Sequence, residues 1–258
     1  MTGARIIPDR GMEEQLLARY PLVGGMDEVG RGSLAGPVSV GLAVVSSATD
    51  PAFPTGLADS KQLTPRRREA LVEPCRRWVT DYAVAHAAPA EIDAVGITGA
   101  LRLAGQRALA AVATRGHLPG AIILDGTVNW LREPTASAAE APAGQAAPAE
   151  GAPAVQPFPS VYTSVKADAH CAVVAAASVL AKVERDTIMA ALPDPGYDWA
   201  RNKGYASPAH VEALARLGAS DLHRRSWHLP GLDRFTARRR AVADAPVLPP
   251  AGRDAHWA

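Results

Sequence analysis

The sequence predicts an α/β fold, and three observations lead to that class. Short apolar segments of strand length are separated by glycine and proline turns. Helix-length segments lie between them, and two begin at Thr64-Pro65 and Ser207-Pro208, where proline suits the first helical turn. The chain has 258 residues, of which 48% are hydrophobic and 21% charged, as is ordinary for a globular protein. Strands and helices are therefore expected to alternate within one large domain.

Five segments have the composition of strands. They are residues 22–26, 38–46, 78–87, 121–126 and 160–166. The first two are joined by a turn-rich connection over residues 32–37. The fourth is apolar until it ends in Asp125, which is typical of a strand buried on both faces.

Four helices are expected between and after these strands. They begin at Pro65, cover 91–113, cover 168–191 and run from Ser207 to Gly218. Gly96 and Gly99 are candidate breaks in the second helix. The third is apolar on nearly every face as far as Lys182, so we expect it to be central and buried.

Composition excludes several classes of protein. The net charge of +1 does not by itself indicate a polyanion partner. Cys75 and Cys171 are too few for a disulfide framework and lack metal-ligand spacing. The N-terminus lacks the apolar run of a secretory signal, and no segment approaches the ~18 apolar residues of a membrane span. A cytoplasmic protein with reduced thiols and no membrane partner is expected.

Acidic residues end or interrupt several of the expected strands. Asp27 and Glu28 follow the first strand, Asp125 ends the fourth, and Asp168 begins the apolar helix. Sites in α/β proteins are commonly assembled at such element ends. Clustered carboxylates repel one another unless a cation neutralises them, and oxygen ligands favour Mg²⁺ or Mn²⁺ over zinc. Two such ions would suit hydrolysis of a phosphodiester.

Each acid also has a structural interpretation. Asp168 at a helix start is, in isolation, more often an N-cap, and Asp125-Gly126 is more often a turn. Asp27 and Glu28 are harder to explain in this way, because adjacent strand residues point to opposite faces and one acid would meet the core. The sequence alone does not show whether the four acids converge.

Basic residues are concentrated toward the C-terminus. Residues 201–240 contain nine Lys or Arg against three acids, with Tyr205 and Trp227 among them. This pattern suits phosphate contacts beside a stacking surface, although a solvated charged face is the commoner explanation. Lys61 and residues 66–68 form a second basic cluster.

Six blocks of sequence carry a resemblance to a known family. They are DEVGRGSLAGPV (27–38), DSKQLTPRRRE (59–69), ILDG (123–126), VKADAHCAVVAAASVLAKVERD (165–186), KGYASPAH (203–210) and HRRSW (223–227). With these blocks in this order, the chain resembles bacterial ribonuclease HII over roughly residues 20–230. The resemblance implies an RNase H-like α/β fold with a mixed central sheet flanked by helices and a small C-terminal helical region.

The resemblance also implies a division of the chain. An N-terminal segment (1–20) precedes the catalytic domain (21–200), and a C-terminal nucleic-acid-binding part (201–240) is followed by a flexible tail (241–258). The Ala- and Pro-rich residues 133–158 are expected to form a disordered insertion within the catalytic domain, because they cannot bury enough apolar surface to offset their ordering entropy.

The resemblance assigns roles to individual residues. The family's metal ligands and catalytic acids fall on Asp27, Glu28, Asp125 and Asp168. The segment Gly30-Arg31-Gly32 resembles the one that senses a ribose 2′-hydroxyl mainly through its backbone, which glycine lets approach closely. Tyr205 resembles the residue that packs on the next deoxyribose. The implied phosphate contacts are Lys61, Lys166, Arg31 and His223.

The expected function is therefore metal-dependent hydrolysis of the RNA strand of RNA–DNA hybrids. Incision on the 5′ side of a single ribonucleotide in duplex DNA is included, with Mg²⁺ or Mn²⁺ as two cofactor ions and 3′-hydroxyl and 5′-phosphate products. A monomer is expected. The alternatives are a nuclease of the same fold that needs several consecutive ribonucleotides, and a catalytically silent nucleic-acid-binding module.

Overall fold

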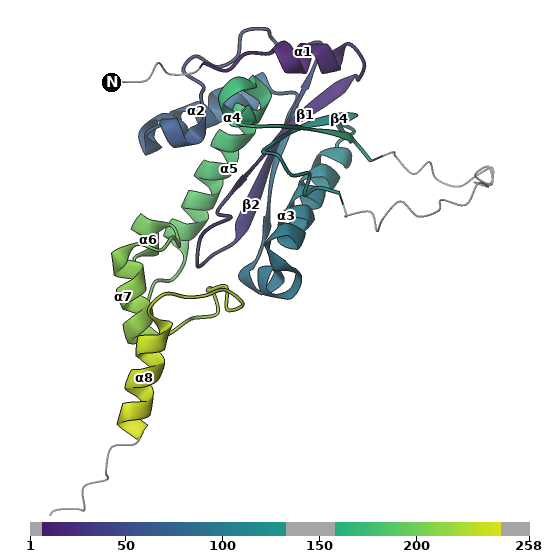
Figure 1. Cartoon of the computed structure of the whole chain (residues 1–258). Helices are drawn as coiled ribbons and strands as arrows, with labels where there is room; N and C mark the ends of the chain where they lie inside the picture. Colours follow the sequence, from purple (N-terminus) through teal and green to yellow (C-terminus); the bar gives the residue numbers. More distant parts are fainter. Residues whose placement is uncertain (1–6, 133–157, 244–258) are drawn as a thin grey trace, which may run out of the picture.

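A mixed five-stranded sheet forms the centre of the molecule (Figure 1). The computed structural model describes residues 7–132 and 158–243. The strands follow the spatial order β3-β2-β1-β4-β5. Their bounds are β1 Leu22–Val29, β2 Val38–Ser46, β3 Asp81–Ala87, β4 Ala121–Asp125 and β5 Ser160–Ser164.

The strand directions bring two acidic segments to one edge of the sheet. β1 pairs antiparallel with β2, so that Asp27 lies opposite Gly41. On its other side β1 runs parallel to β4, with Met26 beside Leu124. Because parallel strands end at the same edge, Asp27 and Asp125, each one residue further on, lie at neighbouring strand ends.

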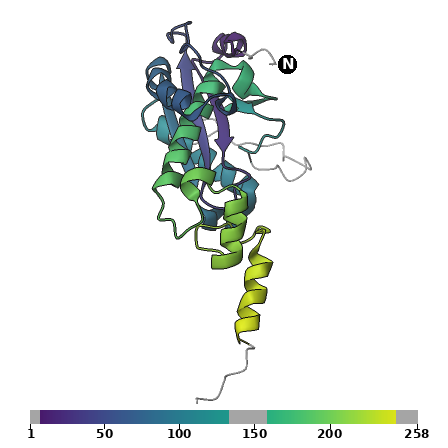
Figure 2. The same cartoon turned by 90° about the vertical axis from the view of Figure 1, so that its left-hand side faces the viewer.

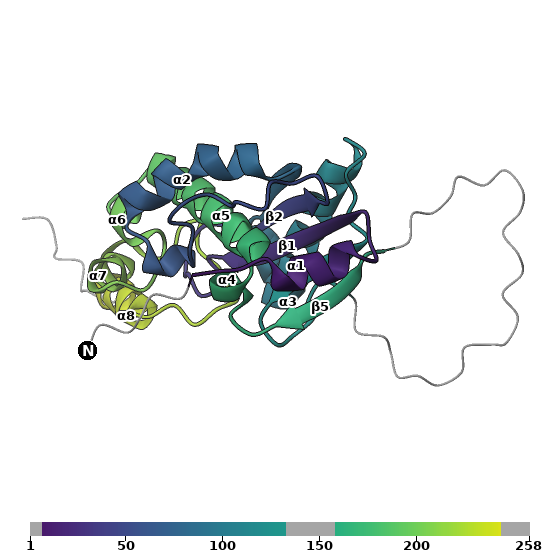
Figure 3. The same cartoon turned by 90° about the horizontal axis from the view of Figure 1, so that it is seen from above.

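Helices cover both faces of the sheet (Figure 3). The bounds of the helical elements are α1 Gly11–Leu17, η1 Ser60–Gln62, α2 Pro65–Trp78, α3 Pro89–Ala113, α4 Ala167–His170, α5 Ala172–Ala191, α6 Trp199–Asn202, α7 Pro208–Leu217 and α8 Leu232–Ala243. α5 packs on one face with α2 outside it, and α3 packs on the other. The sheet is therefore buried on both sides.

Two glycines let α5 lie unusually close to the sheet. A Cβ on Gly25 would lie 2.6 Å from backbone atoms of Val173 and Val174, and one on Gly41 would collide with the carbonyl oxygen of Ala177. Small side chains on this part of α5 continue the close contact, since Ala172 to Ala177 are fully buried. The apolar helix is central and buried, as its composition predicted.

The C-terminal helices pack beyond the end of α5 (Figure 2). α6 and α7 enclose a separate apolar cluster that includes Trp199 and Leu214. Leu34 and Ala35, from the connection between β1 and β2, belong to the same cluster. This connection is thus held between the sheet and the C-terminal part.

The structure confirms several expected boundaries and corrects others. β2 covers the predicted residues, and α2 begins at Pro65 with the Thr64 hydroxyl accepting from the Arg67 amide. The third strand begins at Asp81 rather than Trp78, because α2 continues to Trp78. α8 continues to Ala243, past the expected start of the tail.

Other differences concern helices. The helix expected over 168–191 is two helices, because Cys171 has extended backbone angles and bridges to Asp9. In α3 the backbone leaves the helical conformation at Gly96, one of the two candidate breaks. Helix α1 was not expected, and α6 and α8 were not assigned individually within the expected C-terminal helical region. The insertion over 133–157 and the tail from residue 244 lie outside the described residues. Among the described helices, none combines the length and apolar character that a membrane crossing requires.

Candidate active site

Asp27 and Glu28 lie within β1, directly before its last residue, Val29. Asp27 is 4% exposed, whereas the Glu28 side chain is 17% exposed. The Asp27 side chain is therefore more deeply buried than that of Glu28. The Asp27 Oδ1 atom accepts a hydrogen bond of 2.8 Å from the Glu28 amide, and Arg31 Nη1 lies 3.4 Å from Glu28 Oε1.

Asp125 and Asp168 come together where β4 ends and α4 begins. Asp125 Oδ1 accepts a hydrogen bond of 2.7 Å from the Ala167 amide. Asp168 is not the N-cap of α4, because that position belongs to Lys166, whose φ is 57°. Its carboxylate instead receives Lys61 Nζ at 3.2 Å, while only 3% of the residue is exposed. The capping interpretation of Asp168 is therefore wrong.

A cavity of about 360 Å³ joins most of the predicted site residues. It is lined by Asp27, Glu28, Val29, Gly30, Arg31, Gly32, Ser60, Lys61, Asp125, Lys182 and Tyr205. Asp168 adjoins it through Lys61. One hollow thus contains acids, cations, a glycine-framed segment and an aromatic ring, contributed by segments far apart in the sequence.

Burial and mutual repulsion perturb the acids. Burial raises the pKa of Asp27 to about 8, with the charges of the other three acids adding to the effect and the Ser178 hydroxyl opposing it. Burial likewise raises the pKa of Glu28, against the opposing charge of Arg31. Burial and then the charge of Asp125 raise the pKa of Asp168, against Lys61. The four carboxylates are therefore close enough for electrostatic repulsion between them to affect their pKa values.

The negative charges of the acids also affect the pKa of Lys61, where they stabilise the charged form. Burial alone would lower the pKa of its ammonium, but the charges of Asp168 and Asp27 outweigh burial and raise the pKa above its ordinary value. The side chain is 71% exposed, so it is free to move away from Asp168. An ammonium on a flexible stem suits a contact that changes when a ligand binds.

The donor chemistry of the site fits a hard divalent cation. All four acids offer carboxylate oxygens, the ligands that Mg²⁺ and Mn²⁺ prefer. A bound cation would offset the repulsion that raises the pKa of Asp27. As the side chains stand, no three acidic, His or Cys side chains in the described part of the chain are grouped closely enough to hold one ion.

Gly30 and Gly32 have different surroundings, so a side chain would be excluded at one position and tolerated at the other. Gly30 has a φ of +81°, and a Cβ there would collide with the Arg185 guanidinium. A Cβ on Gly32 would meet no atom within 4 Å. Gly30 is therefore required by the protein itself, whereas the space at Gly32 remains open to a ligand that approaches the backbone.

The remaining predicted contacts divide between the surface and the core. Tyr205 lines the cavity and is 38% exposed. Lys166 is exposed and is not among the residues that line the cavity. His223 is 1% exposed, and its ring nitrogens meet His210 and Ser220. The structure thus gives His223 a packing role in place of the phosphate contact expected from the sequence.

Sequence reasoning missed several residues at the site. Ser60 and Lys182 line the cavity. Arg185 and Arg224 are fully buried and donate hydrogen bonds to the segment after β1. Arg224 belongs to the basic C-terminal region, where the adjacent Arg225 is exposed. The sequence carries no local signal for Arg185 either, because it stands among the charged residues Lys182, Glu184 and Asp186, where an exposed arginine is expected.

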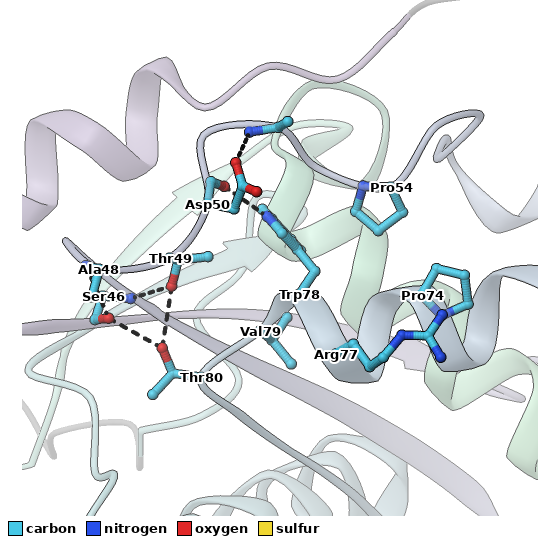
Figure 4. Close-up of a pocket in the computed structure, with 11 residues that line it drawn as sticks. Ser46, Ala48, Thr49, Asp50, Pro54, Pro74, Arg77, Trp78, Val79 and Thr80 are labelled. Carbon is cyan, nitrogen blue, oxygen red and sulfur yellow. Dashed lines mark hydrogen bonds between the residues drawn. The ribbon is translucent and has the colours of Figure 1, made fainter.

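A second hollow, of about 600 Å³, lies at the opposite end of β2 (Figure 4). Its hydroxyl groups bond one another: Thr49 Oγ1 lies 3.2 Å from Thr80 Oγ1, which donates to Ser46 Oγ at 3.2 Å. Trp78 Nε1 donates to the carbonyl of Asp50 at 2.9 Å. These groups close the loop after β2 and share no residue with the acidic cavity.

The sheet order and the acids at neighbouring strand ends define an RNase H-like protein. A sequence model of the family described as ribonuclease HII matches residues 24–229. The chain belongs to the ribonuclease HII family, and it is therefore an enzyme of the nuclease class.

Relatives of known name cover most of the chain. The ribonuclease HII of Streptomyces avermitilis is 45% identical over 231 residues, which are 88% of this chain and 86% of the relative. The ribonuclease HII of Thermus thermophilus is 39% identical over 208 residues, covering 80% of this chain and 86% of the relative.

Solved structures share the fold. The ribonuclease H2 of Pyrococcus horikoshii superposes with a TM-score of 0.60 at 26% identity, covering 85% of this chain and 99% of the other. A ribonuclease HIII described in complex with Mn²⁺ gives a TM-score of 0.56 at 20% identity, covering 85% and 70%. The second likeness concerns the fold alone.

Proposed function

We propose that this protein is an endoribonuclease that hydrolyses the RNA strand of RNA–DNA hybrids and incises duplex DNA on the 5′ side of a single embedded ribonucleotide. The products would carry a 3′-hydroxyl and a 5′-phosphate. One observation supports this most strongly: Asp27, Glu28 and Asp125 line the same cavity as Gly30-Arg31-Gly32 and Tyr205, and Asp168 adjoins it through Lys61. Recognition of a ribose and hydrolysis beside it would then take place in one hollow.

Asp27, Glu28, Asp125 and Asp168 would hold two Mg²⁺ or Mn²⁺ ions. When bound, such ions supply an activated water and stabilise the leaving oxygen of a phosphodiester. The Glu28 amide anchors one carboxylate oxygen of Asp27, and the Ala167 amide anchors one of Asp125. Lys61 would leave Asp168 and move toward the substrate phosphate.

The cations around the acids would bind the nucleic-acid backbone. Arg31, Lys61 and Lys182 line the cavity, and exposed Lys166 lies just beyond it. Phosphate contacts fix the register of a duplex without reading its sequence. The open space at Gly32 would let the backbone of Gly30-Arg31-Gly32 approach the ribose, where the 2′-hydroxyl distinguishes RNA from DNA.

Tyr205 would select the sugar that follows the ribonucleotide. Its ring is partly exposed at the cavity, and the Arg185 guanidinium lies 5.6 Å from the ring centre. A ring held in this way would pack on a deoxyribose, and a 2′-hydroxyl at that sugar would clash. Such packing would favour cleavage at the junction from RNA to DNA.

The test compares three labelled duplexes of one sequence, containing no ribonucleotide, one ribonucleotide or four consecutive ribonucleotides. With Mg²⁺ or Mn²⁺ present, we expect cleavage of the second and third and none of the first. Cleavage of the third alone would favour the nuclease that needs consecutive ribonucleotides. Binding without cleavage of any duplex would favour a silent binding module.

The organisation of the protein in the cell belongs to the same proposal. We propose a monomer that acts in the cytoplasm, with residues 201–240 completing the nucleic-acid groove beside the catalytic part. Sedimentation of the free protein and of its complex with a hybrid duplex would test the monomer, with a 1:1 complex expected. A stable dimer in both states would contradict it.

A further inference from the structure

Two buried arginines lie directly beneath the segment that follows β1. Arg185 comes from α5, and Arg224 comes from the connection between α7 and α8. Both are 0% exposed. In the part of the chain that the structure describes, neither guanidinium forms an ion pair with a carboxylate. Their partners are almost entirely main-chain carbonyl groups.

Arg224 holds the ribose-sensing segment itself. Its Nη1 atom donates to the carbonyl of Arg31 at 2.7 Å, and its Nη2 atom donates to the carbonyl of Gly30 at 2.6 Å. Its Nε atom donates to the carbonyl of Gly36 at 3.3 Å. One planar guanidinium therefore fixes peptide groups at both ends of the segment.

Arg185 supports the residues that follow the ribose-sensing segment. Its Nε atom donates to the carbonyl of Pro37 at 2.9 Å, and its Nη1 atom donates to the carbonyl of Lys203 at 3.0 Å. Ser33 joins the two arginines, because its hydroxyl accepts from Arg185 Nη2 at 2.7 Å and from Arg224 Nη2 at 3.0 Å. The same hydroxyl donates to the carbonyl of Gly30 at 2.9 Å.

The clasp formed by Arg185, Arg224 and Ser33 also reaches the second recognition element. Lys203 and Tyr205 lie within one short turn, so the bond from Arg185 to the Lys203 carbonyl sets the position of both the turn and the ring above it. The Leu34 amide donates to the carbonyl of Gly204 at 2.8 Å. The ribose-sensing segment and Tyr205 are therefore attached to one support.

A role in packing alone would not require these charges. Burying a cation without a carboxylate partner is costly, and apolar side chains of similar volume are usually more stable at such positions. Burial, followed by the charge of Arg185, lowers the pKa of Arg224 to about 9. What a guanidinium provides here is several donors in a rigid planar array, which a lysine cannot reproduce.

We propose that Arg185 and Arg224 are positioning residues for ribonucleotide recognition: together with Ser33 they hold the backbone of Gly30-Arg31-Gly32 in register with Tyr205. This inference rests on the recognition roles given under the proposed function. It assigns to these arginines a specificity role exerted through the backbone, without contact to the substrate.

The experiment measures binding selectivity in the full-length protein, with Asp27→Asn present throughout to prevent hydrolysis. Fluorescence anisotropy gives the dissociation constants for a duplex with one ribonucleotide and for the all-DNA duplex of the same sequence. The variants are Arg185→Lys, Arg224→Lys and Ser33→Ala. The matched control is Arg10→Lys, since Arg10 is 8% exposed and donates to the carbonyls of Thr49 and Asp50, far from the cavity.

The parent should bind the ribonucleotide duplex more tightly. Each arginine variant should reduce this selectivity by about tenfold, or to none if the parent ratio is smaller, because at least one charge-assisted hydrogen bond that holds the connection after β1 is lost. Affinity for all-DNA and the selectivity of Arg10→Lys should stay unchanged. Parental selectivity in the variants, or an equal loss in Arg10→Lys, would overturn the inference.

Two further outcomes remain decisive. If circular dichroism shows that both arginine variants are unfolded, Ser33→Ala carries the test, because it removes only the hydroxyl that bridges the two guanidiniums. A parent that binds both duplexes equally overturns the recognition roles of the proposed function, and the inference with them. That result differs from a selective parent whose variants remain selective, which overturns the inference alone.

Discussion

His210 Nε2 and His223 Nε2 lie 3.0 Å apart in a buried pair. The Ser220 amide donates to His223 Nδ1 at 3.0 Å, and His210 Nδ1 lies 2.9 Å from the Tyr205 carbonyl. These partners fix the tautomers: His223 carries its proton on Nε2 and donates to His210, which carries its own on Nδ1 and donates to Tyr205. A chain of neutral imidazoles therefore leads from Ser220 to the backbone of Tyr205.

This pair predicts a loss of stability in acid. Burial and the neighbouring His210 lower the pKa of His223 to about 4, and burial lowers the pKa of His210. Between about pH 6.5 and 4 the unfolded chain binds the proton that folded His223 excludes, so the free energy of unfolding should fall as the pH falls. The contribution is at most about 1.4 kcal/mol per pH unit.

Urea unfolding at several pH values would measure this effect. The comparison variant is His223→Gln, which cannot titrate, so its free energy of unfolding should decline less steeply from pH 6.5 to 4. The difference between the two slopes isolates the histidine from the buried acids, whose raised pKa values act in the opposite direction. Equal slopes would show that His223 is not the titrating group.

Asp27→Asn should separate catalysis from stability. The amide oxygen can still accept from the Glu28 amide, but the ligand charge is lost, so cleavage of a hybrid should fall by at least about 10³-fold. Because burial raises the pKa of Asp27, folding near neutral pH must either protonate this carboxyl or bury its charge; the amide avoids that cost, so the metal-free protein should melt at the same or a higher temperature. Glu73→Gln, an exposed acid on α2, is the control. Retained turnover in Asp27→Asn would contradict the assignment.

Divalent ions should raise the melting temperature. A cation that binds the folded protein alone relieves repulsion among the four acids and stabilises by mass action, by about 2.7 kcal/mol at 100 times the dissociation constant. Scanning calorimetry with and without Mg²⁺ or Mn²⁺ measures the shift without recourse to activity. Asp125→Asn should show a smaller shift. An equal shift in that variant would place the ion elsewhere.

Tyr205→Ala should weaken preference for the junction. Loss of the ring should reduce the ratio of junction cleavage to cleavage within an RNA tract by roughly tenfold, the scale of one stacking contact. Tyr205→Phe should keep the ratio, because the ring and its contact with the Arg185 guanidinium remain. Mapping products from a duplex with four ribonucleotides gives the ratio. A preference unchanged in Tyr205→Ala would refute the role.

The sequence predicted the acids better than their supports. Asp27 and Asp125 were recognisable because a charge interrupts or ends an apolar strand, which is a local pattern. Arg224 was not, because its burial depends on carbonyls nearly 200 residues away, at Gly30 and Arg31. The break at Cys171 was missed for the same reason, since it arises from pairing with Asp9. The local pattern of apolar residues predicts helices and strands, but it gives no sign of hydrogen bonds that join the backbone to residues distant in the sequence.

Gly41→Ala should destabilise the protein through the contact between α5 and the sheet. The added methyl group would collide with the carbonyl oxygen of Ala177, a backbone atom that cannot move without displacing the helix. Overpacking of this kind costs about 1–3 kcal/mol. Gly99→Ala is the comparison variant, because its methyl group would press on Val95 Cγ2 at 2.9 Å and Cβ at 3.0 Å, atoms of an exposed side chain, and on no other element. Its loss in free energy of unfolding should be smaller than that of Gly41→Ala, since alanine also favours a helix.

The same substitution should also affect activity, because Gly41 pairs with Asp27 in the sheet and α5 carries Arg185. A displaced α5 would shift the clasp relative to the acids, so the kcat of Gly41→Ala on the single-ribonucleotide duplex should fall even at temperatures where the variant is fully folded. Urea unfolding and steady-state kinetics on the same preparations would provide both values. Unchanged stability would mean that α5 can shift at no cost. The close packing of α5 on the sheet would then not be what fixes the clasp relative to the acids.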